Sequence, residues 1–176
     1  SLGSDEPGRR AVAAGEGMLS IIDASSEDQL RHTRSLFQEY ADSLGIDLCF
    51  QDFAEELSTL PGSYARPRGR LLLACWNDAV AGCVALRPLE NGTCEMKRLY
   101  VRPDYRALSV GRSLVERVIQ EAREECYIRM PLDSLPTMTA ALRHYPRLGF
   151  REVPPYRVNP VEGAVFLELQ LAGDPS

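Results

Sequence analysis

The 176-residue sequence lacks any apolar run long enough to cross a lipid bilayer. Its longest run, residues 79–86, has eight residues including a glycine, whereas a spanning helix needs about 20. The sequence also lacks a continuous basic tract, and 20 Lys and Arg against 25 Asp and Glu leave a net charge of −5. Binding to a phosphate backbone depends on clustered cations. We therefore expect neither a membrane nor a nucleic acid as a partner.

Residues that bind metals or form disulfides are also scarce. Only two histidines occur, His32 and His144, and the five cysteines include no Cys-x-x-Cys pair. This pattern indicates neither a zinc centre nor a disulfide framework, so we expect no metal. The widely spaced cysteines are typical of small buried residues in a reducing compartment, which predicts a cytoplasmic location.

The remaining composition is that of a globular protein, with 44% hydrophobic and 26% charged residues. A chain of this length favours one compact domain, which we assign to residues 18–173. Residues 1–17 have neither helical nor strand periodicity. We interpret them as a flexible leader, either an upstream extension or an artificial remnant before a natural start at Met18.

Hydrophobic periodicity predicts an α/β fold. Ser26 with Gln29, and Asp52 with Glu55, have the spacing of capping boxes that open two helices. Turn signals at residues 77–78 and 91–92 join three strands into an antiparallel meander. We expect one mixed, mostly antiparallel sheet of about seven strands with helices on both faces. The predicted strands cover residues 19–24, 70–76, 79–89, 93–102, 128–132, 150–153 and 164–171, and helices begin near residues 26, 52, 109 and 136.

The stretch from Glu95 to Leu114 is the most informative for chemistry, because a strand enters a tight turn that opens directly into a helix. Such a turn directs free backbone N–H groups and the positive end of the helix toward one point, which favours anion binding. Arg106 and Arg112 flank the turn and add donors suited to phosphate. An ordinary connection with solvated arginines explains the turn alone equally well. The glycine patterns of nucleotide and dinucleotide sites are both absent.

Residues 106–111 resemble the Arg/Gln-x-x-Gly-x-Gly/Ala pattern with which the GNAT superfamily of N-acetyltransferases binds the pyrophosphate of acetyl-coenzyme A. Residues 145–150 resemble its Tyr-x-x-x-Gly-Phe block, and the likeness covers about residues 19–171. It implies a GNAT-like fold whose fourth and fifth strands splay apart around pantetheine, and Pro131 suits such a strand edge. It also implies that acetyl-coenzyme A is bound by Leu99, Tyr100, Val101, Arg106, Ala107, Leu108, Ser109, Val110, Gly111, Arg112, Ser113 and Met138.

The resemblance also implies two catalytic residues. Glu95 corresponds to a carboxylate that receives the amine proton directly or through water, although it could equally mark the polar face of a strand. Tyr145 corresponds to the acid that protonates the coenzyme thiolate, although core packing explains a helical tyrosine as well. The acceptor site is implied to lie between residues 40–64 and the loop 154–163, with Tyr40, Tyr64 and Tyr156 in its walls.

Departures from the family pattern leave a second function open. Ala107 and Ser109 stand where many members have glycine, and serine costs about 1–2 kcal/mol if its conformation is left-handed. Pro146 removes a helical N–H beside Tyr145. We predict acetyl transfer from acetyl-coenzyme A to a primary amine of a small molecule, amino acid or peptide in a ternary complex, by a monomer or a homodimer. The alternative is a non-catalytic acyl-coenzyme A-binding or regulatory module.

Overall fold

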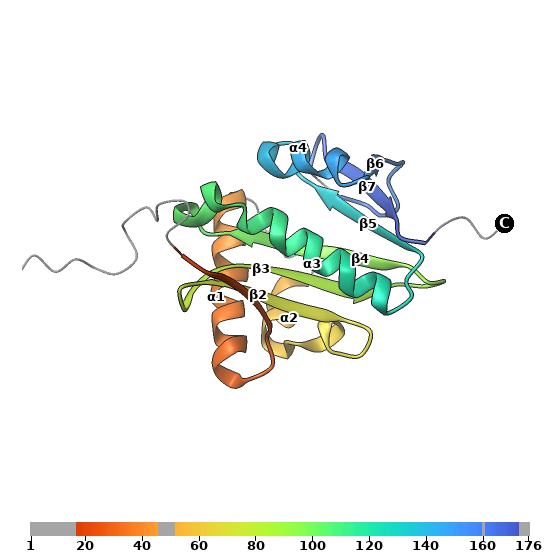
Figure 1. The fold of residues 1–176 in the computed structure, drawn as a ribbon. Coiled ribbons are helices and arrows are strands. Elements are labelled where there is room, and N and C mark those ends of the chain that lie inside the picture. Colours follow the sequence, from red (N-terminus) through yellow and green to blue (C-terminus); the bar gives the residue numbers. More distant parts are fainter. Residues whose placement is uncertain (1–16, 46–51, 160, 173–176) are drawn as a thin grey trace, which may run out of the picture.

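The computed structural model describes residues 17–45, 52–159 and 161–172, so Cys49 and nearly all of the expected leader lie outside the described residues (Figure 1). The described chain folds in the order predicted from the sequence. Its elements are β1 (Leu19–Asp23), α1 (Glu27–Leu44), α2 (Phe53–Thr59), β2 (Arg70–Trp76), β3 (Ala79–Pro88), β4 (Cys94–Val101), α3 (Val110–Glu124), β5 (Arg129–Ser134), α4 (Thr139–Arg147), β6 (Arg151–Glu152) and β7 (Val165–Gln170), with 3-10 turns at Gly62–Tyr64 and Pro103–Leu108.

The seven strands form two antiparallel ladders, in the orders β1-β2-β3-β4 and β5-β7-β6. Between β4 and β5, the described residues contain a single parallel bridge, from Thr93 to Arg129. The predicted strand number, directions and mixed character are confirmed, but the hydrogen bonding of the expected single sheet is interrupted at this point. Beyond the bridge, the facing edges of β4 and β5 leave backbone groups without strand partners. Pro131 lies on β5, the edge strand of its ladder, where a missing N–H is tolerated.

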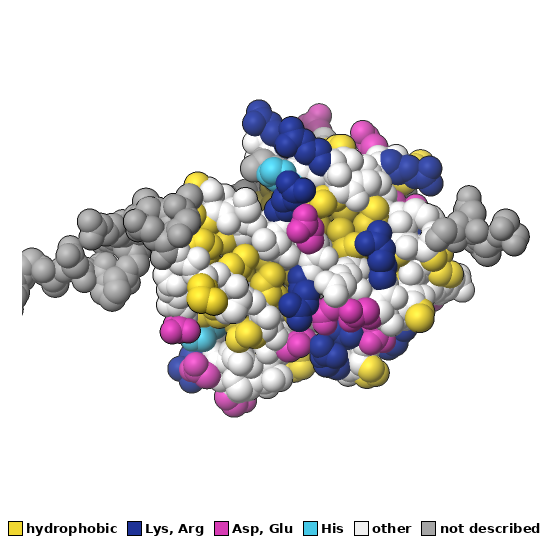
Figure 2. Space-filling model, in the orientation of Figure 1, with side chains coloured by type: hydrophobic (Ala, Val, Ile, Leu, Met, Phe, Trp, Pro, Cys, Tyr) yellow, Lys and Arg dark blue, Asp and Glu magenta, His cyan; other side chains and the backbone are white. Residues whose placement is uncertain are grey.

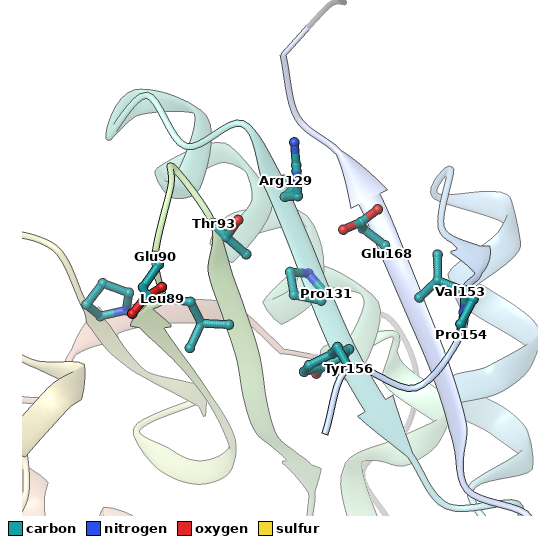
Figure 3. Close-up of a pocket in the computed structure, with 10 residues that line it drawn as sticks. Leu89, Glu90, Thr93, Arg129, Pro131, Val153, Pro154, Tyr156 and Glu168 are labelled. Carbon is teal, nitrogen blue, oxygen red and sulfur yellow. The ribbon is translucent and has the colours of Figure 1, made fainter. Parts of the chain in front are cut away.

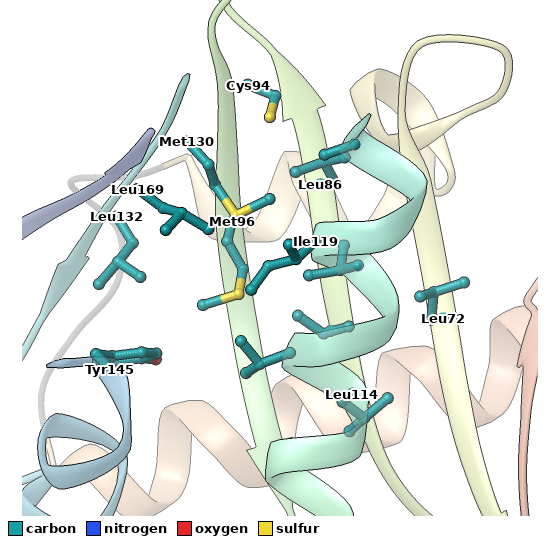
Figure 4. Packing of buried hydrophobic residues seen from close by; sticks show 14 of the residues in the cluster. Leu72, Leu86, Cys94, Met96, Leu114, Ile119, Met130, Leu132, Tyr145 and Leu169 are labelled. Carbon is teal, nitrogen blue, oxygen red and sulfur yellow. The ribbon is translucent and has the colours of Figure 1, made fainter. Parts of the chain in front are cut away.

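Helices cover both faces of the strands, as predicted. Leu36 and Phe37 of α1 and Phe53 of α2 pack on one face, in a buried cluster with Leu73 of β2. On the other face, α3 and α4 pack in a larger cluster (Figure 4), to which both ladders contribute. This larger cluster includes Leu72, Leu86, Met96, Leu114, Met130, Leu132, Tyr145 and Leu169.

A buried ion pair links α3 to the sheet. Arg70 of β2 donates from Nε to Oε1 of Glu121 on α3 at 2.9 Å, and both side chains are buried. A second nitrogen of Arg70 contacts Glu125 at 2.8 Å. Charge-assisted bonds of this kind have defined geometry, so they help to position α3 relative to β4 and β5.

Two local predictions from the sequence have different outcomes. Ser26 and Gln29 form the predicted capping box, in which the Ser26 hydroxyl accepts from the Gln29 amide at 3.2 Å. The second predicted box is wrong, because Asp52 has a φ of 52° and its side chain makes no capping hydrogen bond. Side-chain capping needs an extended N-cap conformation. The expectation of buried cysteines holds for Cys83 and Cys94 but is wrong for Cys126, which is exposed in a left-handed residue after α3.

A bulge in β4 determines which side chains face the two helical layers. The β3–β4 register moves from Cys83–Tyr100 to Ala85–Lys97, and Arg98 has a φ of 58°. One extra residue therefore changes the alternation of side chains along β4. Before the bulge Met96 faces α3, and after it Val101 packs with that same cluster. Glu95, Lys97 and Tyr100 consequently lie on the face covered by α1 and α2.

Candidate active site

The turn after β4 leads into α3 through a left-handed serine. Ser109 has φ 59° and ψ 23°, and its side chain makes no capping bond. The first helical hydrogen bond runs from the Ser113 amide to the Ser109 carbonyl at 3.1 Å. The amides of Val110, Gly111 and Arg112 therefore precede the first acceptor that the helix provides. Together with the positive end of the helix they can bind an anion.

Exposed side chains surround these amides. Arg106, Ala107 and Arg112 are exposed, and Leu108 and Ser113 are half-buried. Arg106 donates from Nε to the Val101 carbonyl at 2.9 Å. This bond holds the Nε side of the guanidinium group, while the side chain remains exposed. A Cβ at Gly111 would lie 3.4 Å from Val101 Cγ2, an ordinary contact. The fold therefore does not require glycine at position 111, although its absent side chain leaves room for a ligand.

We predict that Ser109→Gly stabilises the protein. A left-handed serine costs about 1–2 kcal/mol, and glycine adopts this conformation without strain but loses more entropy on folding. The net gain should be about 0.5–1 kcal/mol, measured as the shift in the urea midpoint. Ser113→Gly, inside α3, is the matched control and should lower stability. Equal destabilisation by both substitutions would contradict the strain at Ser109.

Only some of the residues that the family resemblance assigns to coenzyme binding lie beside the turn before α3. Leu99 and Val101 are half-buried and pack with the α3 cluster, beside the turn. Tyr100 points to the other face, where its hydroxyl lies 3.5 Å from Glu39. The Val110 side chain is fully buried, so only its backbone can contact a ligand. Met138 precedes α4, and its Sδ lies 3.7 Å from Ser134 Oγ at the end of β5.

Tyr145, the candidate acid, lies in α4 within the larger core cluster. It is 4% exposed, and its ring centroid is 5.2 Å from that of Phe150 (Figure 4). Burial raises the pKa of its phenol above the ordinary value of 10.0. Pro146 lies inside α4 without ending the helix, so Tyr145 remains helical.

Glu95, the candidate base, is fully buried and held by three side chains. One oxygen is 2.8 Å from both Nε and an Nη of Arg87 on the neighbouring strand. The other accepts a hydrogen bond from the Tyr156 hydroxyl at 2.6 Å and forms an ion pair with Arg157. A single carboxylate thus faces two guanidinium groups and a phenol. Glu95 has no exposed surface through which an acceptor could reach it directly.

Tyr156 connects this cluster with a cavity of about 710 Å³ (Figure 3). The cavity lies between the starts of β4 and β5 and the loop before β7, and the edge residue Pro131 also lines it. The Tyr156 ring stacks edge-on against Phe166, with centroids 5.3 Å apart. Its hydroxyl is therefore held at Glu95 while the residue is 38% exposed. The remaining lining residues are Pro88, Leu89, Glu90, Thr93, Arg129, Val153, Pro154 and Glu168.

Tyr40 and Tyr64, the other tyrosines expected in the acceptor site, do not line this cavity. Tyr64 is 3% exposed and donates to Glu56 at 2.9 Å, so it is part of the core and an ion-pair network. Tyr40 is half-buried, with its ring 6.2 Å from that of Tyr100. Residues 46–51, within the expected acceptor segment, lie outside the described residues.

The cations around Glu95 are the residues that sequence reasoning missed. Arg87 pairs with Glu95 directly across the β3–β4 hairpin. Counting outward from the predicted two-residue turn at residues 91–92 would have paired Glu95 with Pro88 instead, because the observed register differs from that turn by one residue. Arg157 lies in an irregular loop, for which no periodicity exists. Arg98 reaches Glu56 of α2 at 2.9 Å because of the bulge, which the sequence does not indicate.

Lys97, the only lysine in the chain, is buried beside these arginines. Burial, followed by the charges of Arg98 and Arg87, lowers its pKa to about 8, while Glu56 and Asp133 oppose the shift. Its ammonium forms no ion pair with any of the described residues.

We predict that Lys97 makes stability dependent on pH. Because its folded pKa is below the unfolded value of about 10.4, the unfolded state binds more protons between about pH 8 and 10.4, and stability should rise through that window. Lys97→Met should flatten this rise and stabilise the protein by on the order of 2 kcal/mol at pH 7. Urea unfolding at pH 7 and 10 tests this, and the single labelled lysine gives its pKa directly by NMR. A lysine titrating near 10.4 would contradict it.

Other features that could mark a site in the described residues are charged surface patches, metal-binding clusters and membrane-spanning helices. On the face shown in Figure 2, acidic and basic side chains are interspersed. Within the described residues, His, Cys, Asp and Glu form no group of three or more that could hold a metal ion. None of the described helices is both long and apolar enough to traverse a bilayer.

The fold and the site together define a class of protein. Two strands separate at the point where a helix N-terminus offers free amides, and a cavity adjoins a buried carboxylate on the same two strands. This arrangement suits a transferase whose long donor carries phosphate at one end and reacts in the gap between the strands.

Comparison with known proteins identifies the family. Residues 30–150 match the family model described as the acetyltransferase (GNAT) family. An uncharacterized N-acetyltransferase of Schizosaccharomyces pombe is 38% identical over 156 residues, 88% of this chain and 96% of the relative. The chain therefore belongs to the GNAT family of acetyltransferases and is an acyltransferase enzyme.

Solved structures agree on the fold. An acetyltransferase of the GNAT family from Staphylococcus aureus has a TM-score of 0.72 and 23% identity, covering 88% of this chain and 100% of that one. The PaiA N-acetyltransferase of Thermoplasma acidophilum, solved with coenzyme A, has a TM-score of 0.67 and 14% identity, covering 87% and 99%. The expectation of a GNAT-like fold is thus confirmed.

Proposed function

We propose that the protein transfers the acetyl group of acetyl-coenzyme A to a primary amine, with donor and acceptor bound together. The observation that supports this most is the arrangement of three features along β4 and β5: the free amides at the start of α3, beyond the C-terminal end of β4, the unpaired strand edges, and the cavity beside Glu95 at the other end. The family membership makes acetyl transfer the reaction that these features would serve. We expect the protein to act in the cytoplasm, since its cysteine pattern suits a reducing compartment.

The described residues fit coenzyme A. The amides of Val110, Gly111 and Arg112 would hold the pyrophosphate, and Arg106 would add a charge. The edge of β4 at Leu99 and at the Val101 N–H would bind pantetheine as an added strand, leaving a backbone N–H near the thioester oxygen, while the Val101 carbonyl is held by Arg106. When bound, acetyl-coenzyme A supplies an activated acetyl group as a thioester.

Tyr156 is the residue through which a proton would reach Glu95. The carboxylate is sealed from solvent, whereas the Tyr156 hydroxyl touches it at 2.6 Å and the residue lines the cavity. An acceptor nitrogen in the cavity would pass its proton to the Tyr156 oxygen while the phenolic proton moves to Glu95. Tyr156 gains one proton and loses another in this relay, so its side chain stays neutral. The raised pKa of its phenol therefore does not oppose the relay.

Tyr145 is proposed as the proton donor to the departing thiolate. Burial raises the pKa of its phenol, which keeps the proton in place until a thiolate develops nearby. Its position in the core requires that the thiol end of the donor enters the gap between β4 and β5 to reach it.

The proposed function is tested by thiol release from acetyl-coenzyme A over a panel of amines, with product mass as confirmation. Acceptor-dependent release, reduced by Tyr145→Phe, is expected. Calorimetric binding of acetyl-coenzyme A without turnover on any amine would instead indicate a non-catalytic binding module, as the altered glycine turn at Ala107 and Ser109 first suggested. Absence of both binding and turnover in folded protein would refute both functions.

A further inference from the structure

The face of β3 and β4 that carries Glu95 holds more positive than negative charge. Glu95 is shared by Arg87 and Arg157, whose side chains are 31% and 22% exposed. One carboxylate cannot neutralise two guanidinium groups, so one positive charge remains in a partly buried position. Partly buried charge without a counterion is unfavourable, and binding an anion relieves it.

The other described acidic groups form no ion pair with Arg87 or Arg157. Glu56 is engaged by Arg98, with both of its oxygens within 3.1 Å of the guanidinium. Asp133 accepts a hydrogen bond from the neutral Asn159 amide at 3.2 Å and keeps its charge, which acts on Lys97. Lys97 adds a further buried cation and forms no ion pair within the described part of the chain.

Burial and neighbouring cations both lower the pKa values of two members of this group. Burial and then Arg87 lower the pKa of Arg157 to about 10. Burial, followed by Arg98 and Arg87, lowers that of Lys97 to about 8. Burial therefore disfavours both charged forms, and a bound anion would favour them.

The position of Arg157 relates this anion to the acceptor. Arg157 follows Tyr156 directly in the loop before β7, and both side chains contact the same oxygen of Glu95. An amine placed at the Tyr156 hydroxyl would therefore have a guanidinium only a few bonds away. Guanidinium groups bind carboxylates through paired hydrogen bonds.

We infer that the acceptor is a small amine that carries a carboxylate a few bonds from its nitrogen, such as an amino acid, and that Arg157 binds this carboxylate. The inference rests on the proposed function and narrows its substrate class. Arg87 would keep Glu95 paired while Arg157 turns to the substrate, and Lys97 would add charge to the same region.

The first test is substrate preference. After a survey of the twenty common amino acids, each substrate found is compared with its primary amide and with the amine that lacks the carboxyl group. We expect kcat/KM for the amino acid to exceed both by about tenfold or more, as for a charge-assisted contact. The amide is less basic and the simple amine more basic than the amino acid, so basicity alone cannot favour the amino acid over both.

Two variants test whether Arg157 binds the carboxylate of the acceptor. Arg157→Gln should reduce the preference about tenfold, mainly through KM. Arg31→Gln is the matched control, because it removes an exposed arginine paired only with Asp28 on α1 and should leave the preference unchanged. A preference that survives Arg157→Gln would overturn the assignment of this residue.

A binding measurement separates this inference from the proposed function. The N-acetylated amino acid should raise the NMR-measured pKa of the single lysine, whereas the N-acetylated amide should not. Amines acetylated without regard to a carboxylate would overturn the inference and leave the function intact. Turnover of an aminophosphonate in place of every amino acid would overturn the choice of carboxylate. If no amine is acetylated, the proposed function fails, and the lysine titration still decides whether a carboxylate binds.

Discussion

Glu95→Gln and Tyr156→Phe are each expected to lower kcat by about 10²–10⁴-fold, the contribution of general base catalysis. The carboxylate has no exposed surface, and the Tyr156 hydroxyl is its 2.6 Å contact toward the cavity. Removing either group interrupts the same proton path. The double variant should therefore be no slower than the slower single variant, because the two residues act as one unit. Thiol release at saturating acceptor measures kcat for the parent protein, the two single variants and the double variant.

The controls for this comparison separate catalysis from folding. Tyr156→Phe keeps the ring that packs against Phe166, so thermal unfolding should change little. Tyr127→Phe removes another hydroxyl bond, 2.7 Å to the Arg68 carbonyl, from a ring that packs in the core cluster on the opposite face of the sheet, and should retain kcat. If the effects of Glu95→Gln and Tyr156→Phe multiply in the double variant, the two residues act independently and the relay is wrong.

The fold was largely predictable because its elements have strong periodicity. The apolar repeats of α3 and the apolar runs of β2 and β3 follow from local burial. The left-handed turns at residues 77–78 and 91–92 lie where the Asn-containing turns were expected. The capping box at Asp52 was wrong because side-chain spacing says nothing about whether the N-cap residue is extended. The interruption between the two ladders has no local signal except Pro131, and it was implied only by the family resemblance.

The candidate site was predictable in its backbone and less so in its side chains. The turn before α3 follows from the abrupt change from strand to helix around Ser109. The partners of Glu95 come from two places: a cross-strand neighbour, and two residues of an irregular loop. Only the first depends on strand register, and the turn expected at residues 91–92 gives that register wrong by one residue. Tyr64 lies in the core and does not line the cavity, because its ring is buried and its hydroxyl donates to Glu56. Sequence alone does not separate these positions, since an aromatic residue between helices is as compatible with the core as with a pocket.

Gly111→Asp is expected to abolish detectable binding of acetyl-coenzyme A while leaving the fold at least as stable. A carboxylate in the first turn of α3 complements the helix dipole, and replacing a helical glycine removes an entropic cost, so stability should rise by about 0.5–1 kcal/mol. The position has room for a side chain, since its Cβ would make only an ordinary contact with Val101. The same carboxylate would occupy the amides proposed for the pyrophosphate and repel its charge.

The size of this loss follows from the contacts that are replaced. Each charge-assisted bond contributes about 1.5–3 kcal/mol, so losing two weakens binding by about 100-fold or more. Gly111→Ala adds bulk without charge and should weaken binding less, which separates steric from electrostatic effects. Calorimetry with acetyl-coenzyme A gives the affinities, and urea unfolding gives the stabilities. If Gly111→Asp bound the coenzyme as tightly as the parent protein, the phosphates would have to lie elsewhere, and the start of α3 would lose its role as the anchor of the donor.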